Sequence, residues 1–224
     1  TALAARLSLP VIEDAAHALG ARYADAPIGT HSPFVMFSLQ AIKHMTTIDG
    51  GMLTLADSSL LPRGRRLRWF GIDRAASRTE VDVAEVGFKY HMNNVNATLG
   101  LVQLEHIAPM IARHIDNGRY FDAAFDALGG GIERCVFDAA AAPSYWFYTL
   151  LCDDADGLAR HLSVHGIGNS KAHKRNDRHS VFAGSRVPLP GLDRFHARML
   201  HIPCGWWVTD EDRERIVDVI RGGW

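Results

Sequence analysis

The sequence lacks the features of several large protein classes. It contains only three cysteines, Cys135, Cys152 and Cys204, which are widely spaced and form no CxxC pair. This usage is typical of reduced, buried cysteines rather than of a disulfide framework. No apolar run approaches the ~20 residues that a membrane-spanning helix needs. The first residues also lack the charged start and long apolar centre of a signal peptide. We therefore expect a cytoplasmic protein with no membrane segment.

Strong charge and metal-ligand motifs are missing as well. The formal net charge is −1, so the chain shows no basic footprint for nucleic acid or for an anionic membrane. The 12 histidines are scattered without HExxH or a comparable spacing, and we expect no metal. What the chain does have is 224 residues, 47% of them hydrophobic, which is ample for a globular core.

Informative residues gather around one short apolar run. Phe34–Phe37 is predicted to be a buried strand, and Ser38 and Lys43 follow it closely. Asp49–Gly51 then predicts a turn, and Met52–Leu55 predicts the returning strand. A lysine beside a buried strand end can be desolvated, which lowers its pKa and makes the amine a nucleophile. The alternative is a lysine whose stem covers apolar surface while its ammonium group reaches water.

A second strand end lies upstream. Leu9–Asp14 is predicted to be a short strand that ends in a carboxylate, and His17 follows three residues later. Ligands of open α/β sheets bind at the carboxyl ends of the strands, so Asp14, His17, Ser38 and Lys43 can share one edge. These groups form a set suited to pyridoxal phosphate. A lysine forms the Schiff base, and a carboxylate keeps the pyridine nitrogen protonated.

The ordered set of motifs resembles the DegT/DnrJ/EryC1/StrS family of sugar aminotransferases. The resemblance is carried by Val11–Tyr23, Ile28–Thr30, Phe37–Ser38 with Lys43, Asp49–Met52, Lys89–Asn93 and Ile202–Trp207. It implies an α/β fold of the aspartate-aminotransferase type, known as fold type I. It also implies transfer of an amino group, usually from glutamate, to a keto sugar carried on a nucleotide.

The resemblance assigns roles to individual residues. Lys43 would be the catalytic lysine, and Asp14, His17 and Ser38 would bind the cofactor with it. His17 stands where many relatives carry glutamine, so its role is less defined than that of Asp14. Asn93 would reach the cofactor phosphate of a neighbouring subunit, which implies a homodimer with shared active sites. Asn93 is also a natural helix N-cap, and both roles can hold because helix N-termini attract phosphate.

The resemblance also predicts two domains. Residues 1–108 would be the C-terminal part of the cofactor-binding large domain, and residues 109–224 would form a small C-terminal α/β domain. The front part of the large domain, with a phosphate-binding turn and a stacking aromatic residue, is expected to be missing.

One helical pattern crosses the expected domain boundary. An amphipathic stripe is formed by Leu101, Leu104, Ala108, Ile111 and Ile115. Because proline disrupts a helix interior, we expect a break or kink near Ile107, with Pro109 in the first turn of a second helix. That helix should end at about Leu128, before Gly129–Gly131.

Two basic stretches each have two interpretations. The arginines of residues 60–71 form either a rim that meets a phosphate or diphosphate, or a solvated helix face. Lys171–His179 is either a solvated loop or, as the resemblance implies, part of the substrate site. Arg175 and His179 are its candidate contacts to phosphate or sugar, because a guanidinium group can grip phosphate in a bidentate manner.

Three functions follow from these observations. The first is a pyridoxal-phosphate-dependent aminotransferase with nucleotide-sugar and amino-acid substrates. The second is a sugar dehydratase of the same family, against which Lys43 argues because such enzymes carry histidine at that position. The third is an inactive fragment that acts as a binding module, against which the combination of Asp14, Ser38 and Lys43 argues.

Overall fold

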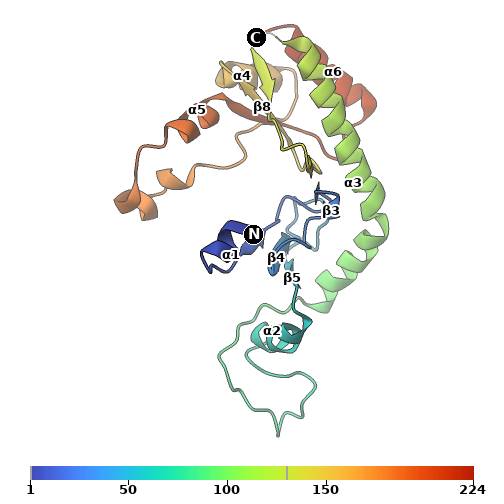
Figure 1. Ribbon diagram of the computed structural model, residues 1–224. Helices are drawn as coiled ribbons and strands as arrows, with labels where there is room; N and C mark the ends of the chain where they lie inside the picture. Colours follow the sequence, from blue (N-terminus) through green and yellow to red (C-terminus); the bar gives the residue numbers. More distant parts are fainter. Residues whose placement is uncertain (1, 130) are drawn as a thin grey trace. The chain divides into compact units, whose positions relative to one another are not determined.

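The computed structural model describes residues 2–129 and 131–224 and divides the chain into two compact units (Figure 1). Unit 1 is Thr1–Ala108 and unit 2 is Pro109–Trp224. Both units are mixed α/β. The cofactor and substrate roles expected for the corresponding domains stay predictions. Among the described residues, none of the helices combines the length and the apolar character required to cross a bilayer.

Unit 1 begins with a short helix and a series of short strands. In chain order its elements are α1 (Ala2–Arg6), β1 (Ile12–Asp14), β2 (Arg22–Tyr23), β3 (Ala26–Pro27), β4 (Phe34–Ser38), β5 (Gly51–Leu55), the 3-10 turn η1 (Ser58–Leu60), α2 (Leu61–Leu67) and the first part of α3 (Asn94–Leu128). The polar stretch between α2 and α3 forms an irregular loop.

The central sheet of unit 1 has the order β1-β4-β5. β1 and β4 run parallel with Asp14 opposite Met36, and β4 and β5 run antiparallel with Ser38 opposite Gly51. The positions of the predicted strands are therefore confirmed, and β1 and β4 end at the same edge. The expected burial of Phe34–Phe37 is wrong, because only Val35 is buried and Met36 is 41% exposed. The turn into β5 favours glycine, because Gly50 has φ +130°, a backbone conformation that other residues rarely adopt.

The predicted helix break near Ile107 is wrong. α3 runs through Pro109 without interruption for 35 residues. A proline removes one intrahelical hydrogen bond and strains the preceding turn. The many other turns of this helix keep their own bonds, so one missing bond does not end it. The predicted C-terminus is confirmed, because Leu128 is the last helical residue and Gly129 has φ +60°. Gly130 lies outside the described residues.

Unit 2 combines a second sheet with the remainder of α3 and three further helices. Its elements are β6 (Ile132–Arg134), β7 (Ala141–Ala142), β8 (Tyr148–Cys152), α4 (Ala155–Val164), the 3-10 turns η2 (Asn176–Arg178) and η3 (Ser180–Ser185), α5 (Pro190–Arg198), β9 (Met199–Ile202) and α6 (Asp210–Arg221). β6, β8 and β9 form an antiparallel sheet in that order.

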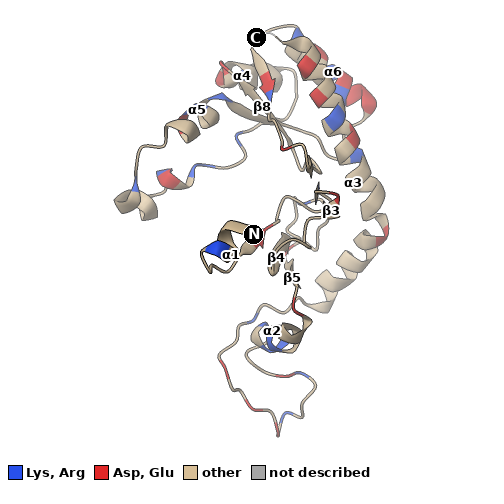
Figure 2. Ribbon diagram, viewed as in Figure 1, with Lys and Arg blue, Asp and Glu red and all other residues tan. Residues whose placement is uncertain are grey.

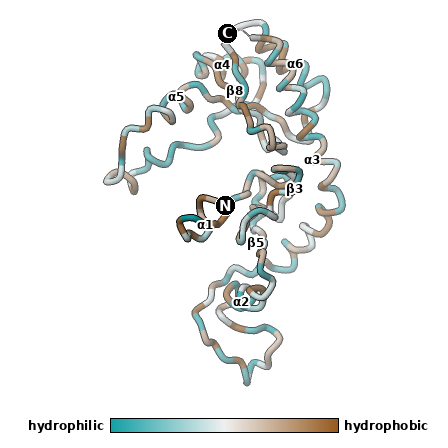
Figure 3. Tube along the Cα trace, viewed as in Figure 1, coloured by the Kyte–Doolittle hydropathy of each residue, from teal (hydrophilic) through white to brown (hydrophobic). Residues whose placement is uncertain are grey.

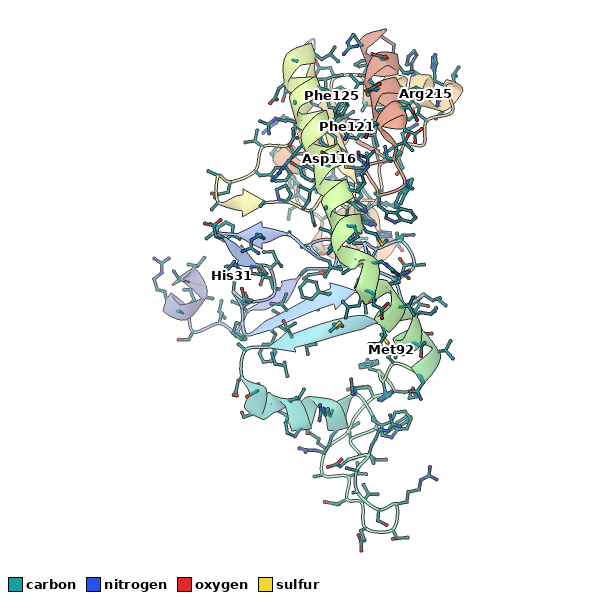
Figure 4. The ribbon with its side chains drawn as sticks, turned by 90° about the vertical axis from the view of Figure 1, so that its right-hand side faces the viewer. His31, Met92, Asp116, Phe121, Phe125 and Arg215 are labelled. Atoms are coloured by element: carbon teal, nitrogen blue, oxygen red, sulfur yellow. The ribbon has the colours of Figure 1, made fainter. Side chains whose placement is uncertain are left out.

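The core of unit 2 lies where α3, α4 and α6 meet this sheet. Phe121 and Phe125 lie one turn apart on α3 and are buried (Figure 4). They pack with Leu150 of β8, Leu158 of α4 and Val217 of α6 in a single cluster. These apolar faces explain why unit 2 forms a closed hydrophobic core.

The ends of the helices in unit 2 follow local sequence signals. Thr209 caps α6, because its side chain accepts a bond from the Asp212 amide while the Asp212 carboxylate accepts one from the Thr209 amide. This reciprocal arrangement is a capping box. Asp154 caps α4 by accepting a 2.8 Å bond from the Gly157 amide.

Candidate active site

Lys43 lies in the connection between β4 and β5, which we call the Lys43 loop (residues 39–50). Two backbone bonds close it: the Leu39 amide donates to the Gly50 carbonyl at 2.9 Å, and the Thr47 amide donates to the Leu39 carbonyl at 2.8 Å. Leu39 and Met45 are buried, whereas Lys43 is only partly exposed. The loop is therefore anchored on apolar side chains while it presents its lysine at the strand ends.

The first turns of α3 hold the other side of this loop. The Asn96 side chain donates to the Asp49 carbonyl at 3.2 Å, and the Gln103 side chain accepts from the Thr46 amide at 2.9 Å. Between them, an added Cβ on Gly100 would lie 2.8 Å from Thr47 Cγ2. Residues spaced by four and three positions share one helix face, so α3 meets the loop through a polar, close-packed face.

This support for the Lys43 loop was missed in the sequence. The apolar stripe drew attention to another face of the same helix, but its members Leu101 and Leu104 are 66% and 57% exposed. The signal that could have identified the true contact face is the spacing of Asn96, Gly100 and Gln103. A polar, small, polar pattern at helical spacing indicates a face that packs closely against backbone.

Burial and a nearby carboxylate act in opposite directions on the Lys43 amine. Partial burial lowers the pKa of Lys43, and the charge of Asp14 opposes this shift by raising it. The two groups are thus close enough to interact, although they come from different elements. Asp14 is the last residue of β1, and its Oδ1 accepts a 3.0 Å bond from the Ala16 amide.

The other predicted cofactor residues are distributed around this pair. Ser38 ends β4 and its hydroxyl accepts a 3.3 Å bond from the Gln40 amide. His17 lies in the turn after β1 and its side chain is exposed. The parallel pairing of β1 and β4 brings Asp14 and Ser38 to one edge, and the Lys43 loop leaves from the same edge.

Asn93 serves as a cap in this structure. Its side-chain oxygen accepts a 2.9 Å bond from the Asn96 amide, and its carbonyl accepts a 3.0 Å bond from the Ala97 amide at the start of α3. The helix-cap interpretation is therefore confirmed. Its contact with a cofactor phosphate in a neighbouring subunit stays a prediction.

The predicted substrate residues Arg175 and His179 lie in unit 2, in the hydrophilic segment around η2 (Figure 3). The Arg175 guanidinium donates to both carboxylate oxygens of Asp177, at 2.9 and 2.8 Å, and also binds Asp193 of α5. Its side chain is only 9% exposed, so it ties this segment to α5. His179 is exposed. Contact of either residue with substrate stays a prediction.

The residues at the β1/β4 edge fit pyridoxal phosphate. The group needs an amine that loses its proton readily, a carboxylate for the pyridine nitrogen and donors for the phosphate. Lys43 supplies an amine with a lowered pKa, and Asp14 supplies a carboxylate within electrostatic range of it. Ser38 supplies a hydroxyl at the neighbouring strand end. The donor set therefore agrees with the group.

Comparison with known proteins identifies the family. The model of the DegT/DnrJ/EryC1/StrS aminotransferase family matches residues 1–221, and the chain belongs to this family. The enzymes of this family depend on pyridoxal phosphate and have fold type I. The predicted family and fold class are confirmed.

Individual relatives extend this finding. The chain is 39% identical to the sugar aminotransferase CalS13 from Micromonospora echinospora, with a TM-score of 0.92 over 96% of this chain and 59% of that one. It is 40% identical to AtS13 from Actinomadura melliaura, with a TM-score of 0.93 over 96% of this chain and 58% of that one.

A curated relative matches a shorter region. UDP-4-amino-4-deoxy-L-arabinose–oxoglutarate aminotransferase from Shewanella sediminis (strain HAW-EB3) is 38% identical over 135 residues. The match covers 57% of this chain and 34% of the relative. The chain thus spans about three fifths of the solved relatives and the match about one third of the curated one.

Proposed function

We propose that this protein is a pyridoxal-phosphate-dependent aminotransferase that transfers an amino group, with glutamate as donor, to a keto sugar linked to a nucleotide. The observation that carries the proposal is the Lys43 amine, which lies in the loop leaving the β1/β4 edge, within electrostatic range of Asp14, with a pKa lowered by burial. The relatives support the substrate class, since one is a sugar aminotransferase and another is named for a UDP-linked amino sugar and oxoglutarate. In this role the protein would work as a homodimer.

Each residue of the site would have its own role in binding the cofactor or in transferring the proton. Lys43 would anchor the cofactor, and its Nζ would then carry the proton to and from the reacting substrate carbon. Asp14, ionised, would hold the proton on the pyridine nitrogen. Ser38 would donate to the phosphate, Asn93 would approach the phosphate of the neighbouring subunit, and His17 would border the ring. When bound, pyridoxal phosphate supplies the electron sink for the transfer.

The anchoring role of Lys43 can be tested by chemical trapping. The protein is incubated with pyridoxal phosphate, reduced with borohydride and digested, and the modified peptide is identified by mass spectrometry. We expect the label on Lys43, and its loss in Lys43→Ala. Lys174→Ala is the matched control, because Lys174 is an exposed lysine of unit 2. A label that persists in Lys43→Ala at wild-type yield would contradict the proposal.

The reaction class needs a second measurement. The protein is incubated with a nucleotide-linked keto sugar and glutamate, and the products are separated. An amino sugar and oxoglutarate support transfer. A deoxygenated sugar would instead support the dehydratase alternative, and neither product from a protein that still takes the label would support a binding role.

A further inference from the structure

A second cluster of functional groups lies in unit 1, outside the Lys43 site. It is a hollow of about 450 Å³ between α2 and the loop that follows it, which we call the arginine hollow. Its lining includes Arg65, Arg66, Arg68, Arg74, Asp73 and His91. Figure 2 shows the concentration of basic residues on α2.

Backbone hydrogen bonds hold the segments that carry these residues close together. Arg65 lies in the last turn of α2, and Arg68 is the C-cap residue that directly follows this helix, still with helical backbone angles. Residues 88–91 return to the end of this helix, because the Phe88 amide donates to the Leu67 carbonyl at 2.7 Å and the Tyr90 amide to the Arg68 carbonyl at 3.0 Å. The hollow is therefore formed by segments that are bonded to each other.

Gly71 and Gly87 bring the two ends of the loop between them into close contact. An added Cβ on Gly87 would lie 2.0 Å from the Gly71 nitrogen, and Gly71 has φ +79°. Larger residues could not approach so closely. The loop thus begins and ends at one point, which places Arg74 of the loop beside His91, to which its guanidinium donates at 2.5 Å.

Aromatic contacts orient the basic groups. The Arg74 guanidinium and the Lys89 ammonium each lie 4.9 Å from the centroid of the Trp69 ring. Such cation–π contacts restrain a charged side chain without neutralising it. The Trp69 ring also meets the His91 ring edge-on at 5.3 Å.

The charges of the hollow are compensated only in part: Asp73 is the carboxylate of its lining, and the charge of Arg66 acts on Glu85. Outside the hollow, Arg63 forms a bidentate pair with Glu85, with nitrogen–oxygen distances of 3.0 and 3.2 Å. Within the described residues, Arg65, Arg66 and Arg68 form no such ion pair. Burial and then the charges of Arg74 and Arg68 lower the pKa of His91, as expected in a field of cations.

We propose that the arginine hollow binds the diphosphate group of a nucleotide-linked ligand. Grouped like charges destabilise a fold unless an anion compensates them. Planar guanidinium groups match phosphate oxygens in a bidentate manner, and several of them suit a diphosphate better than a single phosphate. The inference rests on the proposed function for the identity of the ligand as a sugar nucleotide.

Calorimetric titration tests the inference without any turnover. Inorganic phosphate, inorganic pyrophosphate and UDP are titrated at equal ionic strength. We expect pyrophosphate and UDP to bind at least about tenfold more tightly than phosphate, and the double variant Arg65→Gln/Arg68→Gln to lose about tenfold or more of that affinity. Arg78→Gln is the matched control, because Arg78 is an exposed arginine of the same loop outside the lining and should bind like wild type.

Several results would overturn the inference. These are equal affinity for phosphate and pyrophosphate, or an equal loss in Arg78→Gln. Displacement of UDP by single-stranded oligonucleotides would also overturn it, if longer oligonucleotides bound more tightly than shorter ones. That result would indicate a nucleic-acid-binding surface. Trapping of pyridoxal phosphate on the same samples separates the two proposals. Lost diphosphate binding with intact labelling rejects only the hollow, and lost labelling with intact diphosphate binding rejects only the proposed cofactor site.

Discussion

The two units of the chain bury their apolar residues to different extents. In unit 2, Phe121 and Leu158 are completely buried within a cluster that α3, α4, α6 and the sheet share. In unit 1, the buried apolar residues of the described chain are Ala15, Val35, Leu39 and Met45. Large apolar side chains such as Ile12, 70% exposed, and Leu101, 66% exposed, lie at its surface.

This difference indicates that unit 2 contributes most of the folding stability and that unit 1 carries the candidate binding sites. The unit with the closed core has the apolar burial that stabilises a fold. The unit with the small core carries the Lys43 loop and the arginine hollow, and it holds them through hydrogen bonds and close backbone contacts. Substitutions in unit 2 should therefore affect mainly unfolding, and substitutions in unit 1 mainly ligand binding.

A matched pair of leucines tests the comparison with the largest expected effect. Leu158→Ala in unit 2 should lower the free energy of unfolding by about 2–5 kcal/mol, because it leaves a cavity in a packed core. Leu101→Ala in unit 1 should change it by less than about 0.5 kcal/mol, because the side chain is largely exposed. Urea unfolding followed by circular dichroism measures both values. Equal losses in the two variants would remove the distinction between the units.

A pH titration gives an intermediate effect in unit 2. Burial, together with the charge of His173, lowers the pKa of His201 to about 4 in the folded protein, below the ~6.5 of an unfolded histidine. The unfolded chain therefore takes up this proton first as the pH falls. The free energy of unfolding should decrease between about pH 6.5 and pH 4, by at most about 1.4 kcal/mol per pH unit for one proton.

The control for this titration is His201→Gln. The His201 ring forms a 3.1 Å hydrogen bond between its Nδ1 and the Thr149 hydroxyl, and glutamine keeps a polar partner while it removes the titrating group. Stability of the variant should depend less steeply on pH over the same range. Parallel pH profiles for the two proteins would show that the stability change arises elsewhere.

Features fixed by neighbouring residues were predictable from the sequence. The capping box at Thr209 and Asp212 and the left-handed glycine after Leu128 depend on a few adjacent positions. The same holds for the turn at Gly50. Their side-chain and backbone requirements decide the local structure, so the pattern alone identified the strands around Lys43 and the C-terminal end of α3.

Features fixed by distant residues were not predictable. The continuity of α3 through Pro109 depends on the rest of the helix, not on the proline. The second carboxylate on Arg175 comes from Asp193, on a helix that the sequence pattern did not indicate. The support of the Lys43 loop by Gln103 required knowing which face of α3 meets the loop.

The smallest expected change in stability comes from Asn93→Asp, and it separates the two roles of this residue. Aspartate caps a helix as well as asparagine does, so the 2.9 Å bond to the Asn96 amide can be kept and the free energy of unfolding should change by less than about 0.5 kcal/mol. If Asn93 contacts the cofactor phosphate, the added negative charge should weaken pyridoxal phosphate binding about tenfold or more through repulsion. Fluorescence titration with the cofactor, beside urea unfolding, measures both effects. Unchanged affinity at unchanged stability would leave Asn93 as a cap alone, and unit 1 would then need another residue for this contact.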